Sequence, residues 1–212
     1  MNTFGRKFRV SIFGESHGEL IGVVLDGVPA GLELSEQDFE HDVMRRKSGA
    51  KGTTPRIEDD LPQIVSGVFE GHTTGAPLTI VFENANTKSL DYTQFEAMPR
   101  PGHADLTAAL KWDDCQDPRG GGHFSGRLTA PLCIAGGIAI QILQRRGIEI
   151  AAHIRSIGGE EDRPFCAVVE SKKTLQKLKN KKFPVLDDGV EEKMRDVIMR
   201  ARAEGDSVGG VV

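Results

Sequence analysis

Three short glycine-rich stretches carry the residue types best suited to chemistry. The first has the sequence G-E-S-H-G and runs from Gly14 to Gly18, so that Ser16 and His17 stand between glycines where a ligand can approach the backbone. An imidazole exchanges protons near neutral pH, which makes His17 a candidate acid or base. The pattern also fits the G-x-S-x-G elbow of a serine hydrolase, in which Ser16 attacks a carbonyl group. A plain turn is the third interpretation.

The second stretch is R-P-G-H-A-D, residues 100–105. Arg100 offers a planar guanidinium that suits a phosphate or a carboxylate. The Pro-Gly pair shapes a tight turn and leaves His103 on a loop, where its imidazole could exchange protons. Asp105 is expected either to orient that imidazole or to cap the helix that follows.

The third stretch is D-P-R-G-G-G-H-F-S-G-R, residues 117–127. Three consecutive glycines before a helix would present bare backbone amides to an anion, and the helix dipole favours negative charge there. Arg119, His123, Ser125 and Arg127 add polar side chains within nine residues. The pattern is neither a Walker motif nor a Rossmann fingerprint, so we predict an anion or cofactor loop of another kind.

A basic cluster follows a helical segment near residue 46, and its members are Arg45, Arg46, Lys47, Lys51 and Arg56. Such a cluster is usually a solvated charge run, but several cations also suit a small substrate with a phosphate and other negative groups. The histidines lack H-x-x-x-H and H-E-x-x-H spacing, so no metal site is predicted. A lysine-rich stretch over 172–182 is predicted to be solvated surface, with a nucleic-acid arm as the weaker alternative.

Composition limits the possible partners. The chain has 212 residues with 25 glycines and a net charge of -4, so no global basic field attracts nucleic acid. Cys115, Cys133 and Cys166 lie far apart without CxxC spacing, which favours a reducing compartment over disulfides or a zinc ribbon. No apolar run approaches the roughly 20 residues of a membrane span, and no signal-peptide stretch opens the chain. We therefore expect a soluble, cytoplasmic protein without a membrane partner.

The apolar patterns predict an α+β fold. Alternating residues favour strands over 8–13 and 21–25, and a helix is predicted from Ser35, an N-cap residue followed by an acidic first turn. Residues 63–69 and 77–83 are predicted to form a hairpin around a glycine turn. Helices are further predicted over 105–112, 128–146 and 190–204, with strands over 148–157 and from the last four residues. Antiparallel strands with interspersed helices are typical of the α+β class.

Taken together, these stretches resemble the chorismate synthase family. The resemblance rests on F-G-E-S-H-G followed by I-G-V-V-L-D-G-V-P-A-G, on H-D-V-M-R-R-K-S-G, on R-P-G-H-A-D and on R-G-G-G-H-F-S-G-R-L-T-A, in this order. It implies layered antiparallel sheets flanked by helices, in a chorismate synthase-like fold that is incomplete here. Residues 1–212 would form the N-terminal part of a single catalytic domain whose C-terminal half is absent.

The resemblance also implies an activity. Family members catalyse the trans 1,4-elimination of phosphate from 5-enolpyruvylshikimate 3-phosphate, which gives chorismate in the shikimate pathway of aromatic amino acid biosynthesis. They require reduced FMN without net redox change. A cytoplasmic homotetramer with a small phosphorylated substrate is implied, and an external source of reducing equivalents is expected.

Residue roles follow from the resemblance position by position. His17 would protonate the leaving phosphate, and His103 would protonate or stabilise the reduced flavin. The positions that match substrate-binding residues are Ser16, Arg46, Lys51, Arg100 and Arg127. The positions that match the flavin-contacting tripeptide are His123, Phe124 and Ser125. Only Ser125 keeps the usual residue of that tripeptide, which is Arg-Ser-Ser, and Lys51 stands where the family often has arginine.

Two other functions stay open at this stage. One is a serine hydrolase built on Ser16, although the strand predicted over 21–25 leaves no helix directly after the elbow. The other is an inactive anion-binding or assembly fragment, because family members run well beyond 212 residues. On length alone, the 212 residues by themselves are expected neither to bind FMN tightly nor to turn over substrate.

Overall fold

The computed structural model describes residues 2–47, 59–85 and 98–212. The chain divides into two compact units, of which the first ends at Ala139 and the second runs from Ile140 to Val212. Each unit is described by itself. That residues 1–212 belong to a single catalytic domain stays a prediction.

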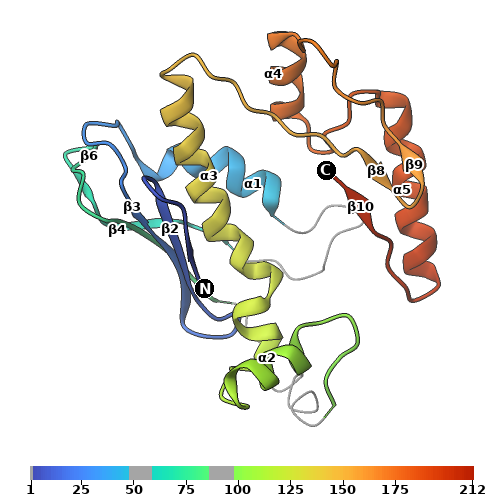
Figure 1. Cartoon of the computed structure of the whole chain (residues 1–212), viewed down its shortest axis with the longest axis horizontal. Helices are drawn as coiled ribbons and strands as arrows, with labels where there is room; N and C mark the ends of the chain where they lie inside the picture. The colour runs from blue at the N-terminus through green and yellow to red at the C-terminus, as the bar shows by residue number, and fades with distance from the viewer. Residues whose placement is uncertain (1, 48–58, 86–97) are drawn as a thin grey trace. The chain divides into compact units, whose positions relative to one another are not determined.

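The first unit is built on a five-stranded antiparallel sheet. Its strands, in spatial order, are β1 (Thr3–Phe4), β2 (Arg9–Gly14), β3 (Leu20–Asp26), β7 (Leu78–Glu83) and β4 (Gln63–Ser66) (Figure 1). The strands predicted over 8–13, 21–25 and 77–83 are thereby confirmed, since alternating apolar residues give each strand one face to bury.

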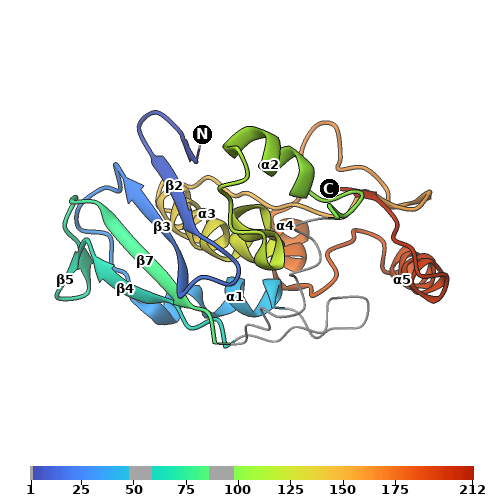
Figure 2. The same ribbon diagram turned by 90° about the horizontal axis from the view of Figure 1, so that it is seen from below.

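The core lies between this sheet and two helices. Residues that share one face of β3 and β7 are completely buried, namely Ile21, Val23, Leu25, Leu78, Ile80 and Phe82. Helix α3 (Thr129–Gln144) contributes the fully buried Ile134 and Ile138. Figures 1 and 2 show α1 (Glu40–Arg46) and α3 on the same side of the sheet. By length and composition alone the helical run Arg119–Gln144 could span a membrane, which is weak evidence because the core helix of a soluble protein meets the same criteria.

The helix predicted from Ser35 is confirmed. The Ser35 backbone N–H donates to Asp38 Oδ2 at 2.7 Å and starts a 3-10 turn, η1 (Glu36–Phe39), which continues directly into α1. Helix α1 ends at Arg46, so two arginines lie in its last turn, where cations complement the helix dipole. The predicted helices over 105–112 and 128–146 are likewise present, as α2 (Asp105–Trp112) and α3.

The predicted hairpin of 63–69 with 77–83 is only partly correct. Strand β4 does pair with β7, but the register shifts between Ile64 and Ser66. Gly67 then takes a φ of +86°, which turns the chain into a separate two-stranded ribbon, β5 (Val68–Phe69) with β6 (His72–Thr73). A left-handed residue at this place ends the ladder because the backbone leaves the plane of the sheet.

The second unit packs around helix α5 (Asp188–Ala203). Its Val190 and Met194 are buried with Val185, and Ile154, Ile157 and Phe183 pack against them. A small sheet has the order β10 (Gly210–Val211), β8 (Ser156–Ile157) and β9 (Glu160–Glu161). These elements confirm the predicted helix over 190–204 and the strand near the end of the sequence.

One prediction for this unit is wrong in part and another gains detail. A strand over 148–157 forms only at its last two residues, because Ile154 N–H bonds to Pro184 O in a connecting segment rather than to a strand. The lysine-rich stretch over 172–182, predicted to be solvated surface, is a surface segment that contains helix α4 (Lys172–Asn180), which Ser171 caps through the Thr174 N–H at 3.0 Å. The apolar Leu178 gives this helix a buried side.

A buried carboxylate connects several segments of the second unit by hydrogen bonds. Asp162 accepts hydrogen bonds from the backbone N–H groups of Leu186, Asp187 and Arg163 and from His153 Nδ1. Burial acts to raise the pKa of Asp162, but these donors outweigh burial and hold the pKa below its ordinary value of 3.8. Folding therefore gains stability from the ionised form.

We predict that Asp162→Asn destabilises this unit by about 3 kcal/mol, because an amide N–H₂ would face backbone donors in a buried site. The wild-type contribution is complete above pH 3.8 and is lost as the pH falls through the lower folded value. Hydrogen exchange of the Leu186 and Asp187 amides, compared between the two proteins at several pH values, measures both effects. Glu161→Gln, which alters only an exposed pair with Arg155, serves as the control. Equal protection in Asp162→Asn and the wild type would contradict this prediction.

Candidate functional site

The turn between β2 and β3 carries the first candidate residues. Gly18 N–H closes it by donating to Glu15 O at 3.1 Å, and Gly14 enters it with a φ of +91°. A side chain at Gly14 would collide with the backbone of Leu20, so the strand can end here only at a glycine. Within the turn, Ser16 and His17 are buried, with 1% and 7% of their surfaces exposed.

The glycine loop packs directly on this turn. It forms η3 (Arg119–Phe124), and Gly120, Gly121 and Gly122 all take positive φ. Gly122 O accepts a hydrogen bond from Ser16 N–H at 3.1 Å. A Cβ on Gly120 would lie 2.5 Å from Cδ2 and 2.6 Å from Nε2 of His17. The stretch predicted to be a loop is therefore a run of 3-10 turns that the three glycines interrupt with a kink, and their lack of side chains lets the backbone approach the imidazole.

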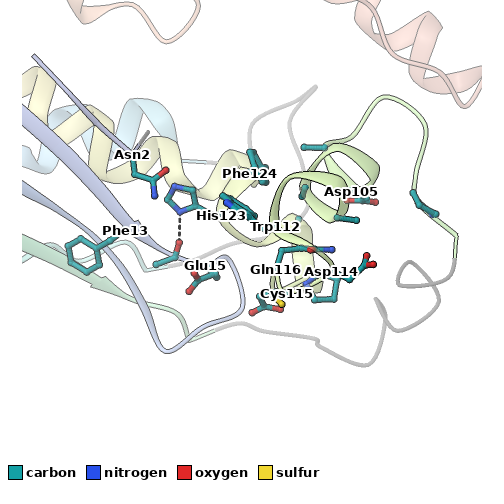
Figure 3. A pocket seen from close by; sticks show the side chains of 18 of the residues that line it. Asn2, Phe13, Glu15, Asp105, Trp112, Asp114, Cys115, Gln116, His123 and Phe124 are labelled. Atoms are coloured by element: carbon teal, nitrogen blue, oxygen red, sulfur yellow. Dashed lines mark hydrogen bonds between the residues drawn. The ribbon is translucent and has the colours of Figure 1, made fainter.

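A second contact fixes the same loop against β2. His123 Nδ1 donates to Gly14 O at 2.9 Å (Figure 3). The next residue, Phe124, packs on Trp112 of α2 with ring centroids 5.0 Å apart. These contacts place the two residues on the wall of a pocket.

The pocket has a volume of about 930 Å³ and belongs wholly to the first unit. Its wall includes Phe13, Trp112, Gln116, His123 and Phe124 (Figure 3). Gln116 Oε1 is buried and accepts no hydrogen bond from the residues that the structure describes. The described lining contains carboxylates but neither lysine nor arginine. This pocket suits a flat, largely apolar ring that can donate an N–H, and its described wall offers no side-chain cation for a phosphate.

Two arginines share one buried carboxylate beside the turn. Arg46 Nη1 donates to Asp60 Oδ2 at 2.8 Å, and Arg127 Nη1 donates to Asp60 Oδ1. Arg127 and Asp60 are 5% and 4% exposed. Two cations facing one carboxylate leave a net positive charge, which favours an anionic ligand. Asp60 was missed from the sequence, where it is one of two adjacent aspartates in a polar segment with no signal of burial.

The two remaining arginines of the glycine-rich stretches are paired locally. Arg100 binds Asp105 through Nε and Nη2 at 2.8 and 3.0 Å, so Asp105 neither orients His103 by a hydrogen bond nor caps α2 as expected. Arg119 binds Asp117 in the same two-pronged way. The guanidinium beside each carboxyl holds the pKa of Asp105 and of Asp117 below the ordinary value, and His17 adds a smaller effect at Asp117.

The structure therefore brings some predicted residues together and leaves others apart. Ser16 and His17 meet the glycine loop, His123 and Phe124 line the pocket, and Arg46 and Arg127 meet at Asp60. His103 is exposed and does not line the pocket, while Ser125 caps η4 (Gly126–Leu128) by accepting from Arg127 N–H at 3.3 Å. Lys51 and Arg56 lie outside the described residues.

Comparison with known proteins decides the family. A family model described as chorismate synthase matches residues 8–212. The chain belongs to the chorismate synthase family. It is 58% identical over 162 residues to a chorismate synthase of Chitinophaga pinensis, covering 76% of this chain and 48% of the relative. It is 44% identical over 214 residues to that of Korarchaeum cryptofilum, covering 99% of this chain and 57% of the relative.

The fold agrees with the family. A crystal structure of a chorismate synthase superposes with a TM-score of 0.68 at 26% identity, covering 97% of this chain and 56% of that one. The α+β class with antiparallel sheets and helices is thereby confirmed. The chain spans about half the length of the curated relatives that it matches.

Gly120→Ala tests the approach of the loop to His17. We expect a loss of about 1–3 kcal/mol in the free energy of unfolding, because an alanine there is strained at a φ of +61° and its Cβ meets the imidazole. Urea unfolding followed by the fluorescence of Trp112, the chain's one tryptophan, measures it in this unit. Gly126→Ala is the matched control, since no atom of the described residues lies within 4 Å of its added Cβ. Equal stability of the two variants would contradict the contact.

Asp60→Asn tests the shared carboxylate. Asparagine tolerates the left-handed backbone of Asp60, whose φ is +49°, so the change removes charge with little strain. We expect a loss of about 3 kcal/mol in the free energy of unfolding, because two guanidinium groups lose their common counter-charge in a buried place. The exposed neighbour Asp59 gives the control Asp59→Asn. A cost below about 1 kcal/mol for Asp60→Asn in the same unfolding measurement would argue against the shared pair.

Proposed function

We propose that this chain provides the proton-donating and phosphate-binding part of a chorismate synthase. The reaction is the elimination of phosphate from 5-enolpyruvylshikimate 3-phosphate to give chorismate. The observation that carries the proposal is the packing of His17 against the glycine loop, since it presents a buried imidazole beside a cation-rich corner. Membership of the family supports it.

The residues of the site have different proposed roles, which follow from their charge. In the reaction, the bond from a ring carbon to a phosphate oxygen breaks, and a hydrogen leaves a second ring carbon. His17 would donate a proton to the departing phosphate oxygen, which lowers the negative charge that the product must carry away. Arg46 and Arg127 would hold the anionic groups of the substrate. Asp60 neutralises only one of these two cations, so the cluster keeps a net positive charge. Ser16 would add a hydroxyl donor from the same turn.

We further propose that the pocket holds the ring system of reduced FMN. The aromatic wall of Phe124 and Trp112 fits a flat ring, and Gln116 Oε1, which has no donor among the described residues, fits an N–H of that ring. The bound flavin would supply an electron-rich ring without net redox change. His123 would keep the glycine loop in place beside it. The phosphate of FMN is assigned to none of the described residues, because the lining among them offers no side-chain cation.

Other parts of the assignment also stay proposals. These are the acid role of His103 toward the flavin, the substrate contacts of Arg100 and Lys51, the flavin contact of Ser125, the homotetramer, the cytoplasmic location and the external reductant. The serine hydrolase gains no support, since strand β3 rather than a helix follows Ser16.

The decisive experiment uses a chimera in which this chain is continued by the C-terminal part of the Chitinophaga pinensis relative. With reduced FMN and 5-enolpyruvylshikimate 3-phosphate under anaerobic conditions, we expect it to release phosphate and form chorismate. The 212-residue chain alone is expected to form none. His17→Ala should lower the rate of the chimera by about 10²–10⁴-fold, as loss of a general acid does. His72→Ala, at an exposed histidine of β6 that bonds to Glu70 O in the preceding turn, is the matched control.

Two outcomes would overturn this proposal. One is a chimera that is folded by circular dichroism and binds the substrate by calorimetry but forms no chorismate. The other is ester hydrolysis that is lost in Ser16→Ala and survives in His103→Ala, which would favour the hydrolase.

A further inference from the structure

Asn84 occupies a place that the proposed chemistry does not account for. It follows directly on β7, and its backbone N–H donates to Glu19 O at 3.0 Å, next to the pairing of Leu20 with Glu83. The ladder between β7 and β3 is thereby continued by one more bond. This places the Asn84 side chain at the turn that carries Ser16 and His17.

The carboxamide of Asn84 bonds to both ends of that turn. Its Nδ2 donates to Glu15 O at 3.1 Å and to Gly18 O at 2.9 Å. Because Gly18 N–H closes the turn onto Glu15 O, these two carbonyl groups flank Ser16 and His17. Both hydrogens of the amide are therefore used to hold the two ends of the turn.

The oxygen of the same carboxamide bonds to the cation pair. Asn84 Oδ1 accepts from Arg127 Nε at 3.1 Å, while Arg127 also binds Asp60. Carbonyl groups only accept and guanidinium groups only donate, so one orientation of the amide satisfies all three partners. No carboxylate, hydroxyl or methyl group in this place could do the same.

We propose that Asn84 is a positioning residue that fixes the turn of His17 relative to Arg127. This inference rests on the proposed function, in which His17 gives a proton to a phosphate held by the arginines. A proton donor and an anion-binding cation act together only at a fixed separation, and a displacement of about 1 Å can cost a hundredfold in rate. The amide sets that separation through three hydrogen bonds from one rigid group.

Asn84→Asp distinguishes the bonds to the turn from the bond to Arg127. The carboxylate keeps the size of the side chain and an acceptor for Arg127, but it turns an oxygen toward the carbonyl groups of Glu15 and Gly18. Gln63→Glu is the matched control, since it makes the same amide-to-acid change on the neighbouring strand β4, at an exposed residue bonded to Glu83. Asn84→Ala removes all three bonds without burying a charge.

The first measurement uses the 212-residue chain. We expect the Gly18 amide of Asn84→Asp to exchange with solvent about tenfold faster than in the wild type or in Gln63→Glu, because the turn loses two hydrogen bonds. The ring resonances of His17, observed with ¹⁵N-labelled histidine, should move as well. A merely structural role would lower the free energy of unfolding and leave both signals of the folded chain unchanged. Should Asn84→Asp fail to fold, Asn84→Ala gives the same two signals.

The second measurement uses the chimera. In Asn84→Asp we expect kcat to fall about a hundredfold with KM for the substrate unchanged within about threefold, since the Arg127 contact is kept. In Asn84→Ala, KM should rise too. Wild-type exchange, wild-type ring resonances and wild-type kcat in Asn84→Asp would overturn the inference. If His17→Ala were fully active, the proposed function would fail, and the exchange data would still decide whether Asn84 holds the turn.

Discussion

The candidate site depends on the close approach of a backbone without side chains to an imidazole. Gly120 lies so near His17 that even a methyl group would collide with the ring, and Gly122 bonds to the neighbouring Ser16. Positive φ at three successive glycines makes this approach possible. The glycine loop and the strand turn are far apart in the sequence, yet each fixes the shape of the other.

Charge balance completes the arrangement. Asp60 gives the half-buried Arg46 and the buried Arg127 a common partner inside the unit, which makes it possible for two guanidinium groups to lie close together. Asn84 then connects Arg127 to the turn. The pocket that Gly121 and His123 of the glycine loop help to line has aromatic side chains and carboxylates, and its described residues include no side-chain cation. One loop thus contacts both the turn of His17 and the pocket suited to a flat ring.

Much of the fold could be predicted from local patterns. Strands β2, β3 and β7 follow from alternating residues, and α1 follows from Ser35 with its acidic first turn. Predictions failed where long-range partners decide the structure. Residues 148–155 have the composition of a strand, but Ile154 N–H bonds to Pro184 O in a connecting segment, and the stretch after Gly67 forms its own ribbon. Pairing of a strand needs a free neighbouring edge, which no local pattern reveals.

The sequence by itself determined the family, the α+β class and the residue types that could do chemistry, because glycine, histidine and arginine in those motifs are dictated by local backbone and charge requirements. Only the tertiary structure decided which of them meet. It joined His17 to Gly120, placed Asp60 between two arginines and left His103 exposed. The contacts of Asp60 and Asn84 were not predicted, since an isolated polar residue acquires its role only when folding buries it beside groups that are distant in sequence.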